Sequence, residues 1–271
     1  MQRKTNENWV ESQKTTFTNW ANRVLGGLYK LTDIETDFND GLILIMLFEQ
    51  LRKMKMTVKY NQQPKSEIHK IENCENALNF IKEDDVKLVN IGAKDIVDGN
   101  LRLILGLLWT LIQKYQIGKD GQNATRKGLI DWVNEHLTEM KVNDFSQSWS
   151  DGTVLCNLTN TIRPGTVDVE HEEMKKGNLE RVRYVQQMAF EKLHIPIVMP
   201  AEHIACEQPD ELSLMLYVSY FRMRPEELNE NEKNDAEEVD MRKKCFWYLV
   251  MIVAFIGGFI NFYYQHTTNK K

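Results

Sequence analysis

The residue types that most often carry out chemistry are present in this sequence, but their spacing matches no catalytic or metal site. The four cysteines, Cys74, Cys156, Cys206 and Cys245, form no CxxC pair and have no histidine at zinc-ligand spacing. Residues 37–41 (DFNDG) resemble the start of a calcium loop, but the glycine is fifth rather than sixth and no glutamate stands at the twelfth position. Phosphate-loop, dinucleotide and HExxH motifs are absent from the sequence. The sequence therefore predicts no enzyme, no metal and no cofactor.

Positive charge gathers between residues 52 and 70, although the chain as a whole is acidic. The sequence has 34 basic and 39 acidic side chains, a formal net charge of −5, which argues against a protein that coats nucleic acid. In this segment Glu67 is the single acid. The bases are Arg52, Lys53, Lys55, Lys59, Lys65 and Lys70. Such a patch attracts an acidic partner, and the attraction weakens as salt rises.

An internal repeat indicates how the chain is organised. Residues 17–25 (FTNWANRVL) match residues 129–137 (LIDWVNEHL), about 110 residues further on. Near the same offset, residues 37–47 (DFNDGLILIML) match residues 148–158 (SWSDGTVLCNL), and each has an Asp-Gly pair before a helix. We expect each copy to be a domain, since 271 residues are enough for two.

Both copies are predicted to be helical. Trp20, Val24 and Leu28 fall at i, i+4 and i+8, the spacing of a helix face that packs on a core. Tryptophans at helical spacing usually belong to the core, so Trp20, Trp109 and Trp132 are predicted to be buried. No alternating run of useful length suggests a strand. The predicted fold class is therefore all-α.

The C-terminal part of the sequence has a different character. Residues 245–265 (CFWYLVMIVAFIGGFINFYYQ) include no charged side chain, and a helix of this length would span about 31 Å, the thickness of a hydrocarbon core. Aromatic residues at both ends suit the membrane interface. We predict a transmembrane helix at 245–265 in a lipid bilayer, an acidic tether with a basic end at 225–244, and a short tail at 266–271.

The orientation of this span follows from the rest of the chain. The N-terminus shows no secretory signal, so we expect a tail-anchored, single-pass protein with its N-terminal head in the cytosol. Asn123 and Asn157 begin glycosylation acceptor motifs, so a lumenal head is an open alternative. Cys245, at the membrane edge, is a candidate lipidation site. Gly257 and Gly258 leave dimerisation through the transmembrane helix open.

Several segments resemble tandem calponin-homology domains, as found in the actin-binding domains of filamins, alpha-actinins and spectrins. In the first copy these are residues 13–20 (QKTTFTNW), 40–44 (DGLIL), 87–90 (KLVN) and above all 95–115 (DIVDGNLRLILGLLWTLIQKY). In the second copy, residues 210–217 (DELSLMLY) resemble the partner domain. The filamin-type pair is the most similar, partly through residues 53–64 (KMKMTVKYNQQP). With its membrane anchor, the layout is more like calmin or a miniature nesprin.

The resemblance implies two tandem calponin-homology domains, at residues 12–117 and 125–224, with a flank at 1–11 and a linker at 118–124. It also implies binding along actin filaments (F-actin), mainly through the first domain. The implied contacts lie on the first helix, on the loop after the second helix and on the closing helix. They are Gln13, Lys14, Thr15, Phe17, Thr18, Lys53, Lys55, Lys59, Tyr60, Asn61, Lys65, Asp98, Asn100, Leu101, Leu103, Ile104 and Leu107.

These inferences predict a protein that links the actin cytoskeleton to a membrane. The alternative is a membrane-anchored helical adaptor that docks a non-actin protein or microtubules. The connector at residues 116–125 contains two glycines and can bend. The resemblance implies that opening of the two domains exposes the actin-facing surface of the first.

Overall fold

The computed structural model describes residues 2–118, 121, 123–138 and 140–223. Up to Arg222 the chain forms one compact unit. The predicted tether at 225–244, the transmembrane helix at 245–265 with Cys245, and the tail at 266–271 lie outside the described residues. Across the described ranges, no helix combines the length and the apolar character that a membrane span needs.

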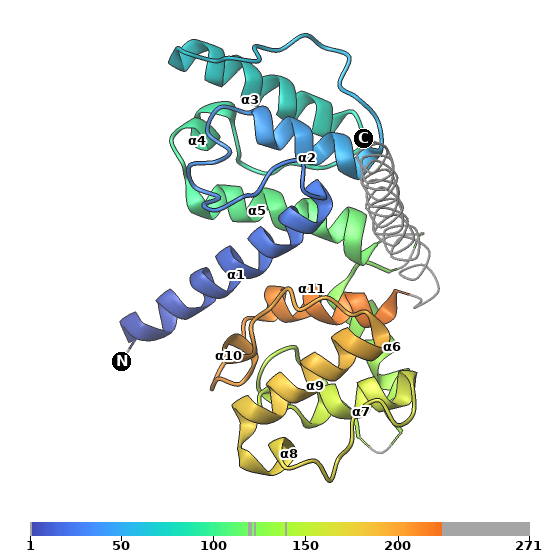
Figure 1. The fold of residues 1–271 in the computed structure, drawn as a ribbon. Helices are drawn as coiled ribbons and strands as arrows, with labels where there is room; N and C mark the ends of the chain where they lie inside the picture. The colour runs from blue at the N-terminus through green and yellow to red at the C-terminus, as the bar shows by residue number, and fades with distance from the viewer. Residues whose placement is uncertain (1, 119–120, 122, 139, 224–271) are drawn as a thin grey trace, which may run out of the picture. The chain divides into compact units, whose positions relative to one another are not determined.

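The first half of the described chain is a helical bundle that ends in a π-helical segment (Figure 1). Its elements are α1 (Gln2–Leu25), α2 (Leu42–Arg52), α3 (Glu67–Lys82), α4 (Ala93–Val97), α5 (Leu101–Ile112) and the π-helical segment Gln113–Ile117. α1 packs against α2 and α5, and α3 packs against α2 and α4. We call this the first bundle.

The second half repeats this plan with shorter connecting helices. Its elements are α6 (Arg126–His136), a 3-10 turn (Gln147–Trp149), α7 (Thr153–Ile162), α8 (Glu173–Lys176), α9 (Asn178–Leu193), α10 (Ala201–Ile204) and α11 (Glu211–Arg222). The described residues of both bundles contain no strand, so the all-α prediction is confirmed for them. We call this half the second bundle.

Matching Asp-Gly pairs start α2 and α7 in the same way. The Asp40 carboxylate accepts a hydrogen bond from Leu42 N (2.9 Å), and the Asp151 carboxylate accepts one from Thr153 N (2.8 Å). Gly41 has φ 78°, so the turn needs a residue that tolerates the left-handed region. A Cβ on Gly41 would lie 2.8 Å from the backbone of Asn73, which is too close for another residue.

Matching asparagines close the first helix of each bundle. Asn22 Nδ2 donates to Leu31 O (3.0 Å), and Asn22 Oδ1 accepts from Leu31 N (2.7 Å). Asn134 forms the same pair of hydrogen bonds with the backbone of Val142, both at 2.8 Å. Each side-chain amide therefore satisfies both polar groups of one backbone residue in the loop that follows the helix.

The tryptophans differ in burial. Trp20 is buried, as predicted, but Trp109 and Trp132 are only half-buried. Trp109 stacks on Phe17 with ring centroids 6.1 Å apart. The fully buried tryptophan of the second bundle is Trp149, which the helical spacing did not single out.

Leu28 does not continue the buried face of α1, so that prediction is wrong. α1 ends at Leu25, and the next two residues, Gly26 and Gly27, have φ of 56° and 84°. The chain turns there, and Leu28 is 60% exposed. A helical spacing predicts a buried face only as far as the helix extends.

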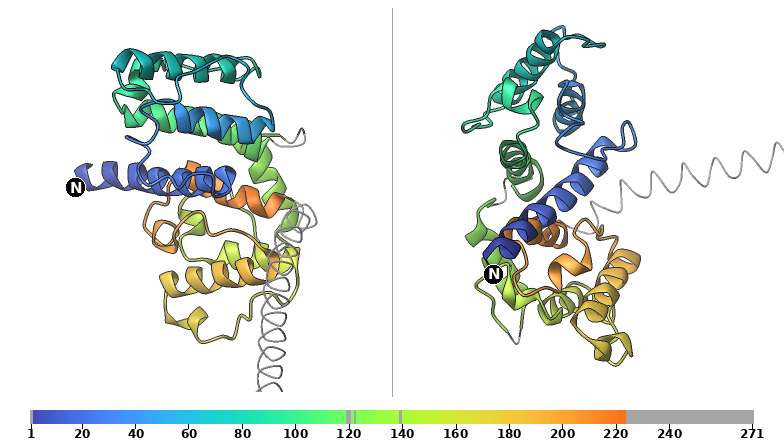
Figure 2. Two further views of the ribbon diagram at one scale, coloured as in Figure 1. Left: turned by 45° about the horizontal axis from the view of Figure 1, so that its top comes forward. Right: turned by 90° about the vertical axis from the view of Figure 1, so that its left-hand side faces the viewer.

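α1 lies between the rest of the first bundle and the second bundle in Figure 1 and in both views of Figure 2. Its contacts with the second bundle are partly polar. Gln13 Nε2 donates to Asp210 Oδ1 (3.0 Å), and Asn19 Nδ2 donates to Val198 O (2.9 Å). α1 also packs against α11. α1 therefore packs against helices of both bundles.

Candidate functional site

The basic loop between α2 and α3 is anchored at its start by Glu49. This carboxylate is buried within the apolar helix α2. Its Oε1 accepts a hydrogen bond from Met56 N (3.0 Å), and its Oε2 pairs with Lys55 Nζ (2.6 Å). The hydrogen bond to Glu49 raises the pKa of the exposed Lys55 ammonium. Lys55, a predicted contact residue, is thus held at one end of the loop.

Asn73 of α3 anchors the same loop further along. Its buried Nδ2 donates to Asn61 O (2.8 Å) and to Asp40 O (3.0 Å), and its Oδ1 accepts from Asn61 N (2.9 Å). Asn73 therefore joins the loop to the start of α2. The sequence analysis did not identify Glu49 or Asn73. Both residues could have been recognised in the sequence, because each is a polar residue at a core position of an otherwise apolar helix face.

Between these anchors the loop presents positive charge. Lys53, Lys59 and Lys65 are exposed, and Tyr60 is half-buried. Arg52 has a different role, because its guanidinium lies 5.0 Å from the ring centre of Phe80 and pairs with carboxylates at the end of α3. The lysines of the loop are available to a partner, whereas Arg52 belongs to the fold.

On α1, Lys14 is held by two carboxylates. Its Nζ lies 2.6 Å from Glu35 Oε1 and 3.1 Å from Asp33 Oδ1. The hydrogen bond with Glu35 raises the pKa of the Lys14 ammonium, against the opposing effect of partial burial. Thr15 and Thr18 lie beside Lys14 in a shallow polar pocket of about 260 Å³. Three of the predicted contact residues of α1, Lys14, Thr15 and Thr18, therefore lie together on a polar part of the surface.

The start of α5 joins the other two segments. Gly99 has φ 69°, and a Cβ there would lie 2.8 Å from Glu35 O, so the segment that holds Lys14 lies against the start of α5. On the other side, Lys94 Nζ bridges Asp98 Oδ1 (3.0 Å) and Glu67 Oε1 (3.1 Å). Glu67 is two residues after Lys65.

The structure thus brings the three predicted contact segments together on the first bundle. We call the combined region the three-segment surface. Its exposed or half-buried members are Lys14, Thr15, Thr18, Lys53, Lys55, Lys59, Tyr60, Asn61, Lys65, Asp98, Asn100, Leu101 and Leu103.

Four residues of the predicted set are buried in this arrangement: Gln13, Phe17, Ile104 and Leu107. Phe17 packs on Trp109, and Gln13 is covered where it meets the second bundle. A partner could reach these side chains only after neighbouring helices move. Contact with a partner stays a prediction for all seventeen residues, and these four are covered in this structure.

The cysteines and acidic residues of the described ranges do not form a reactive or metal-binding centre. No group of three or more histidine, cysteine, aspartate or glutamate side chains there could hold a metal ion. Burial raises the pKa of the Cys74 thiol to about 12, which keeps it protonated and unreactive at neutral pH.

Comparison with known families identifies two similar domains in the chain. The profile described as "Calponin homology (CH) domain" matches residues 11–117 and 123–227. The described part of the chain is also similar in fold to the actin-crosslinking core of fimbrin from Schizosaccharomyces pombe, with a TM-score of 0.66 at 23% identity. That similarity covers 79% of this chain and 48% of the fimbrin chain.

Curated relatives match most of the chain. Alpha-actinin-like protein 1 of Schizosaccharomyces pombe is 36% identical over 223 residues, which cover 79% of this chain and 35% of that protein. Filamin-C of Rattus norvegicus is 36% identical over 224 residues, again 79% of this chain but 8% of filamin-C. This chain therefore spans about a third of the first relative and less than a tenth of the second.

Proposed function

The chain belongs to the calponin homology domain family, and on that basis we propose that it binds actin filaments, chiefly through its first domain, and links them to a membrane. The observation that supports the proposal most strongly is the three-segment surface. Residues from α1, from the loop after α2 and from the start of α5 form one region on the first bundle. Several linked segments can contribute to one interface, which a filament needs because a single small contact would be too weak to hold the protein.

The chemistry of this surface also suits actin. Lys53, Lys59 and Lys65 carry positive charge toward an acidic filament, which speeds encounter and makes binding salt-dependent. Met54 and Val58, on the same loop, are exposed apolar side chains. Apolar contacts within a basic rim combine affinity with long-range attraction. Binding should therefore weaken with salt without disappearing.

Co-sedimentation with actin filaments tests the first half of the proposal. The full-length chain, kept soluble in mild detergent, should pellet with filaments at about 50 mM salt and progressively less toward about 300 mM. Microtubules serve as the second polymer in the same assay. Pelleting with microtubules alone, or with neither polymer at low salt, would support the adaptor alternative and remove the actin proposal.

The membrane half of the proposal rests on the sequence of residues 245–265, which contain no charge over a length that spans a bilayer. The full-length chain should stay with membranes after extraction in alkaline carbonate, and deletion of 245–265 should release it. Release of the full-length chain would contradict the anchor. A mass decrease on glycosidase treatment would indicate a lumenal head, which actin cannot reach.

A further inference from the structure

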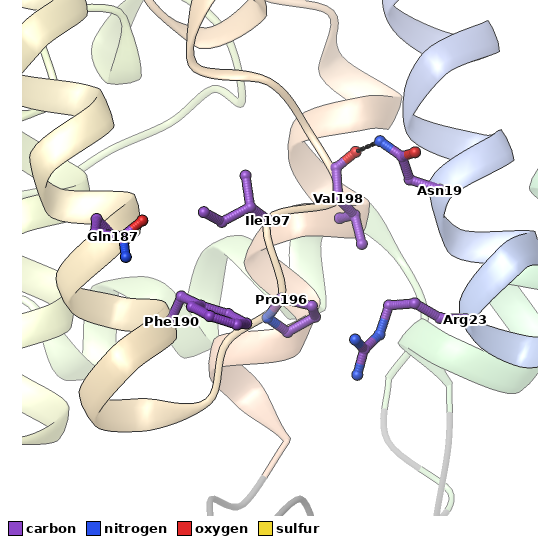
Figure 3. A pocket seen from close by; sticks show the side chains of 7 residues that line it. All are labelled: Asn19, Arg23, Gln187, Phe190, Pro196, Ile197 and Val198. Carbon is purple, nitrogen blue, oxygen red and sulfur yellow. Dashed lines mark hydrogen bonds between the residues drawn. The ribbon is translucent and has the colours of Figure 1, made fainter. Parts of the chain in front are cut away.

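A second surface lies where α1 meets the second bundle. Here α1 faces α9 and the segment after it across a pocket of about 380 Å³ (Figure 3). Its lining residues are Asn19, Arg23, Gln187, Phe190, Pro196, Ile197 and Val198. Both bundles contribute, and none of the seven residues is a member of the three-segment surface, although Asn19 also lines the polar pocket beside Lys14. The pocket therefore needs an explanation of its own.

One wall of the pocket is apolar. Phe190 comes from α9, and Pro196 and Ile197 come from the segment that follows it (Figure 3). Phe190 is 47% exposed and Ile197 is 42% exposed, a high exposure for side chains of this size. Burial of apolar surface makes a favourable contribution to binding. An apolar side chain placed between Phe190 and Ile197 would gain this contribution from both.

The opposite wall carries a positive charge. Arg23 reaches from α1 toward Pro196 (Figure 3). Its guanidinium hydrogen-bonds to Tyr220, and it forms no ion pair with any carboxylate of the described residues. A guanidinium has five N–H donors, so several remain for a ligand. A carboxylate is the group that matches this geometry best.

Two side-chain amides complete the lining. Asn19 Nδ2 donates to Val198 O (2.9 Å), which ties the apolar wall to α1. Gln187 Nε2 donates to Glu191 Oε1 (2.5 Å). The side-chain carbonyl oxygens of Asn19 and Gln187 are hydrogen-bond acceptors at the lining of the pocket. They can accept the N–H groups of a peptide, whereas a fatty acid carries no such donor.

We propose that this pocket binds an acidic peptide segment of a partner protein. An apolar or aromatic side chain of the peptide lies against Phe190 and Ile197, and an adjacent carboxylate pairs with Arg23. The volume fits one or two side chains, at the lower end of the range of about 300–1,000 Å³ for ligand pockets. Because both bundles line the pocket, a bound peptide also favours the arrangement in which they are packed together.

The test uses the full-length chain in lipid nanodiscs and three short capped peptides, with empty nanodiscs as the blank. The peptides are SDFES (acidic with an aromatic anchor), SKFKS (basic) and SDAES (acidic without the anchor). Binding is measured by saturation-transfer NMR and by calorimetry. We expect SDFES to bind at least tenfold more tightly than the other two. Equal binding of SDFES and SKFKS, or no binding of SDFES at millimolar concentration, would overturn the proposal.

Charge reversal supplies the decisive variant. Arg23→Glu should abolish the binding of SDFES and allow the binding of SKFKS, because the new carboxylate pairs with the lysines of that peptide. Lys82→Glu is the matched control, since Lys82 is also an exposed base in the last turn of its helix. The control should bind all three peptides as the unmodified chain does. Unchanged binding of SDFES by Arg23→Glu would contradict the proposal.

Phe190→Ala tests the apolar wall and helps to distinguish a peptide from other ligands of the pocket. This variant should bind SDFES at least fivefold more weakly than the unmodified chain does, and its affinity for SDAES should be unchanged. Octanoate serves as the acyl-chain probe: if octanoate binds more tightly than SDFES and Phe190→Ala abolishes that binding, the pocket is a lipid site and the peptide proposal is wrong. Sedimentation of the chain covers self-association. A dimer that Phe190→Ala dissociates would make the occupant a second copy and would equally overturn the proposal.

Discussion

Asn73 has an effect on the structure larger than its size suggests. One buried amide makes hydrogen bonds to the backbone of Asp40 and of Asn61, two residues far from it along the chain. A buried backbone group that loses its partner costs about 1–3 kcal/mol. Asn73 thus connects the stability of the first bundle to the shape of its basic loop.

Replacement of Asn73 should therefore destabilise the protein. We expect Asn73→Ala to lower the free energy of unfolding by about 1–3 kcal/mol, since it leaves part-buried backbone groups of Asp40 and Asn61 without these partners. Urea denaturation of the full-length chain measures the change. Asn76→Ala is the control, because Asn76 makes only a long hydrogen bond of 3.5 Å to Lys59 O. Equal losses in the two variants would show that the Asn73 bonds contribute little.

Asp84 is a second residue with several partners. Its carboxylate accepts a hydrogen bond from the Tyr115 hydroxyl and lies 3.1 Å from Lys114 Nζ and 3.5 Å from Arg52 Nε. Partial burial alone would raise the pKa of Asp84, but the hydrogen bonds from Tyr115 and Lys114 outweigh it and lower the pKa. The ionised carboxylate joins the end of α3 to the π-helical segment after α5.

The direction of this shift predicts a dependence on pH. A carboxyl whose pKa is lower in the folded state than in the unfolded state stabilises the fold above the unfolded value, about 3.9 for aspartate. That stabilisation is lost as pH falls from about 4 through the lower folded pKa. Asp84→Asn should therefore lower the unfolding temperature at pH 7 and flatten its fall in acid. Glu75→Gln, on the exposed face of α3, is the control for loss of one carboxylate, and the effect of Asp84→Asn should exceed it.

At the scale of elements, glycine decides how closely helices approach. Gly41 starts α2 at φ 78° and lies against the backbone of Asn73. Gly26 follows α1 at φ 56°, but open space surrounds it, with no atom within 4 Å of a Cβ built there. At Gly26 only the backbone conformation disfavours a side chain, whereas at Gly41 neighbouring atoms disfavour it as well.

Alanine at each position tests this difference. Gly26→Ala should cost about 1 kcal/mol of stability, the penalty of the left-handed region. Gly41→Ala should lose about 1–3 kcal/mol more, because α2 or α3 must shift to accommodate the methyl group. Thermal unfolding of both variants measures the difference. A loss at Gly41 no larger than at Gly26 would mean that α2 and α3 separate at little cost.

The loop between α2 and α3 is the element on which the proposed actin binding depends most. Lys59→Glu combined with Lys65→Glu should weaken filament binding at least tenfold at low salt, about 1.4 kcal/mol, because attraction becomes repulsion. The difference from the unmodified chain should shrink as salt rises. Co-sedimentation measures both effects.

The control for this pair carries the same change of charge on the same bundle. Lys82→Glu with Lys87→Glu alters two exposed bases, one in the last turn of α3 and one in the segment that follows it. Filament binding should stay within about twofold of the unmodified chain, apart from a small loss from net charge. If both pairs weaken binding equally, general charge rather than the three-segment surface governs the interaction.

For the molecule as a whole, the contact between the bundles includes polar side chains of α1. Ser12, Thr16, Asn19 and Arg23 share one face of α1 at i, i+4, i+7 and i+11. The hydroxyls of Ser12 and Thr16 are buried and have no hydrogen-bond partner in the described part of the chain. Each such group costs about 1–3 kcal/mol that water would relieve. This cost favours a contact that can open, as the proposed exposure of the first domain requires.

Arg222 opposes that opening. It is buried at the end of α11, and its guanidinium donates to Ile117 O at the end of the first bundle and to Asn123 O (3.1 Å) before the second. Burial lowers the pKa of Arg222, but a guanidinium stays protonated at neutral pH. One side chain therefore holds both ends of the connector.

Loss of this contact should loosen the pair of bundles. Arg222→Met keeps the bulk of the side chain but removes its donors, so hydrogen exchange should become at least tenfold faster in α11 and in the π-helical segment Gln113–Ile117. Arg163→Met is the matched control, because Arg163 donates to Lys192 O (2.7 Å) within the second bundle alone. Unchanged exchange in Arg222→Met would show that other contacts hold the bundles together.

The sequence by itself was sufficient for the fold class and for the repeat. Helical spacing is a local property, so Trp20 and the Asp-Gly pairs at Gly41 and Gly152 could be interpreted without knowledge of the rest of the chain. The lysines of the basic loop were recognisable for the same reason, since a local excess of charge in a loop tends to be solvated. The sequence also carries the whole argument for the transmembrane helix at 245–265.

Only the tertiary structure decided which faces are covered. Helical spacing places Phe17 and Ile104 on a face, but whether a partner can reach them depends on helices far away in the chain. Arg52 and Lys53 are adjacent bases in the sequence, and only the structure distinguishes their environments. Arg52 lies over Phe80, whereas Lys53 is exposed. The pocket between Arg23 and Phe190 joins residues from opposite ends of the described chain. Periodicity reports neighbours within a few turns, and burial depends on contacts between residues that are distant in sequence.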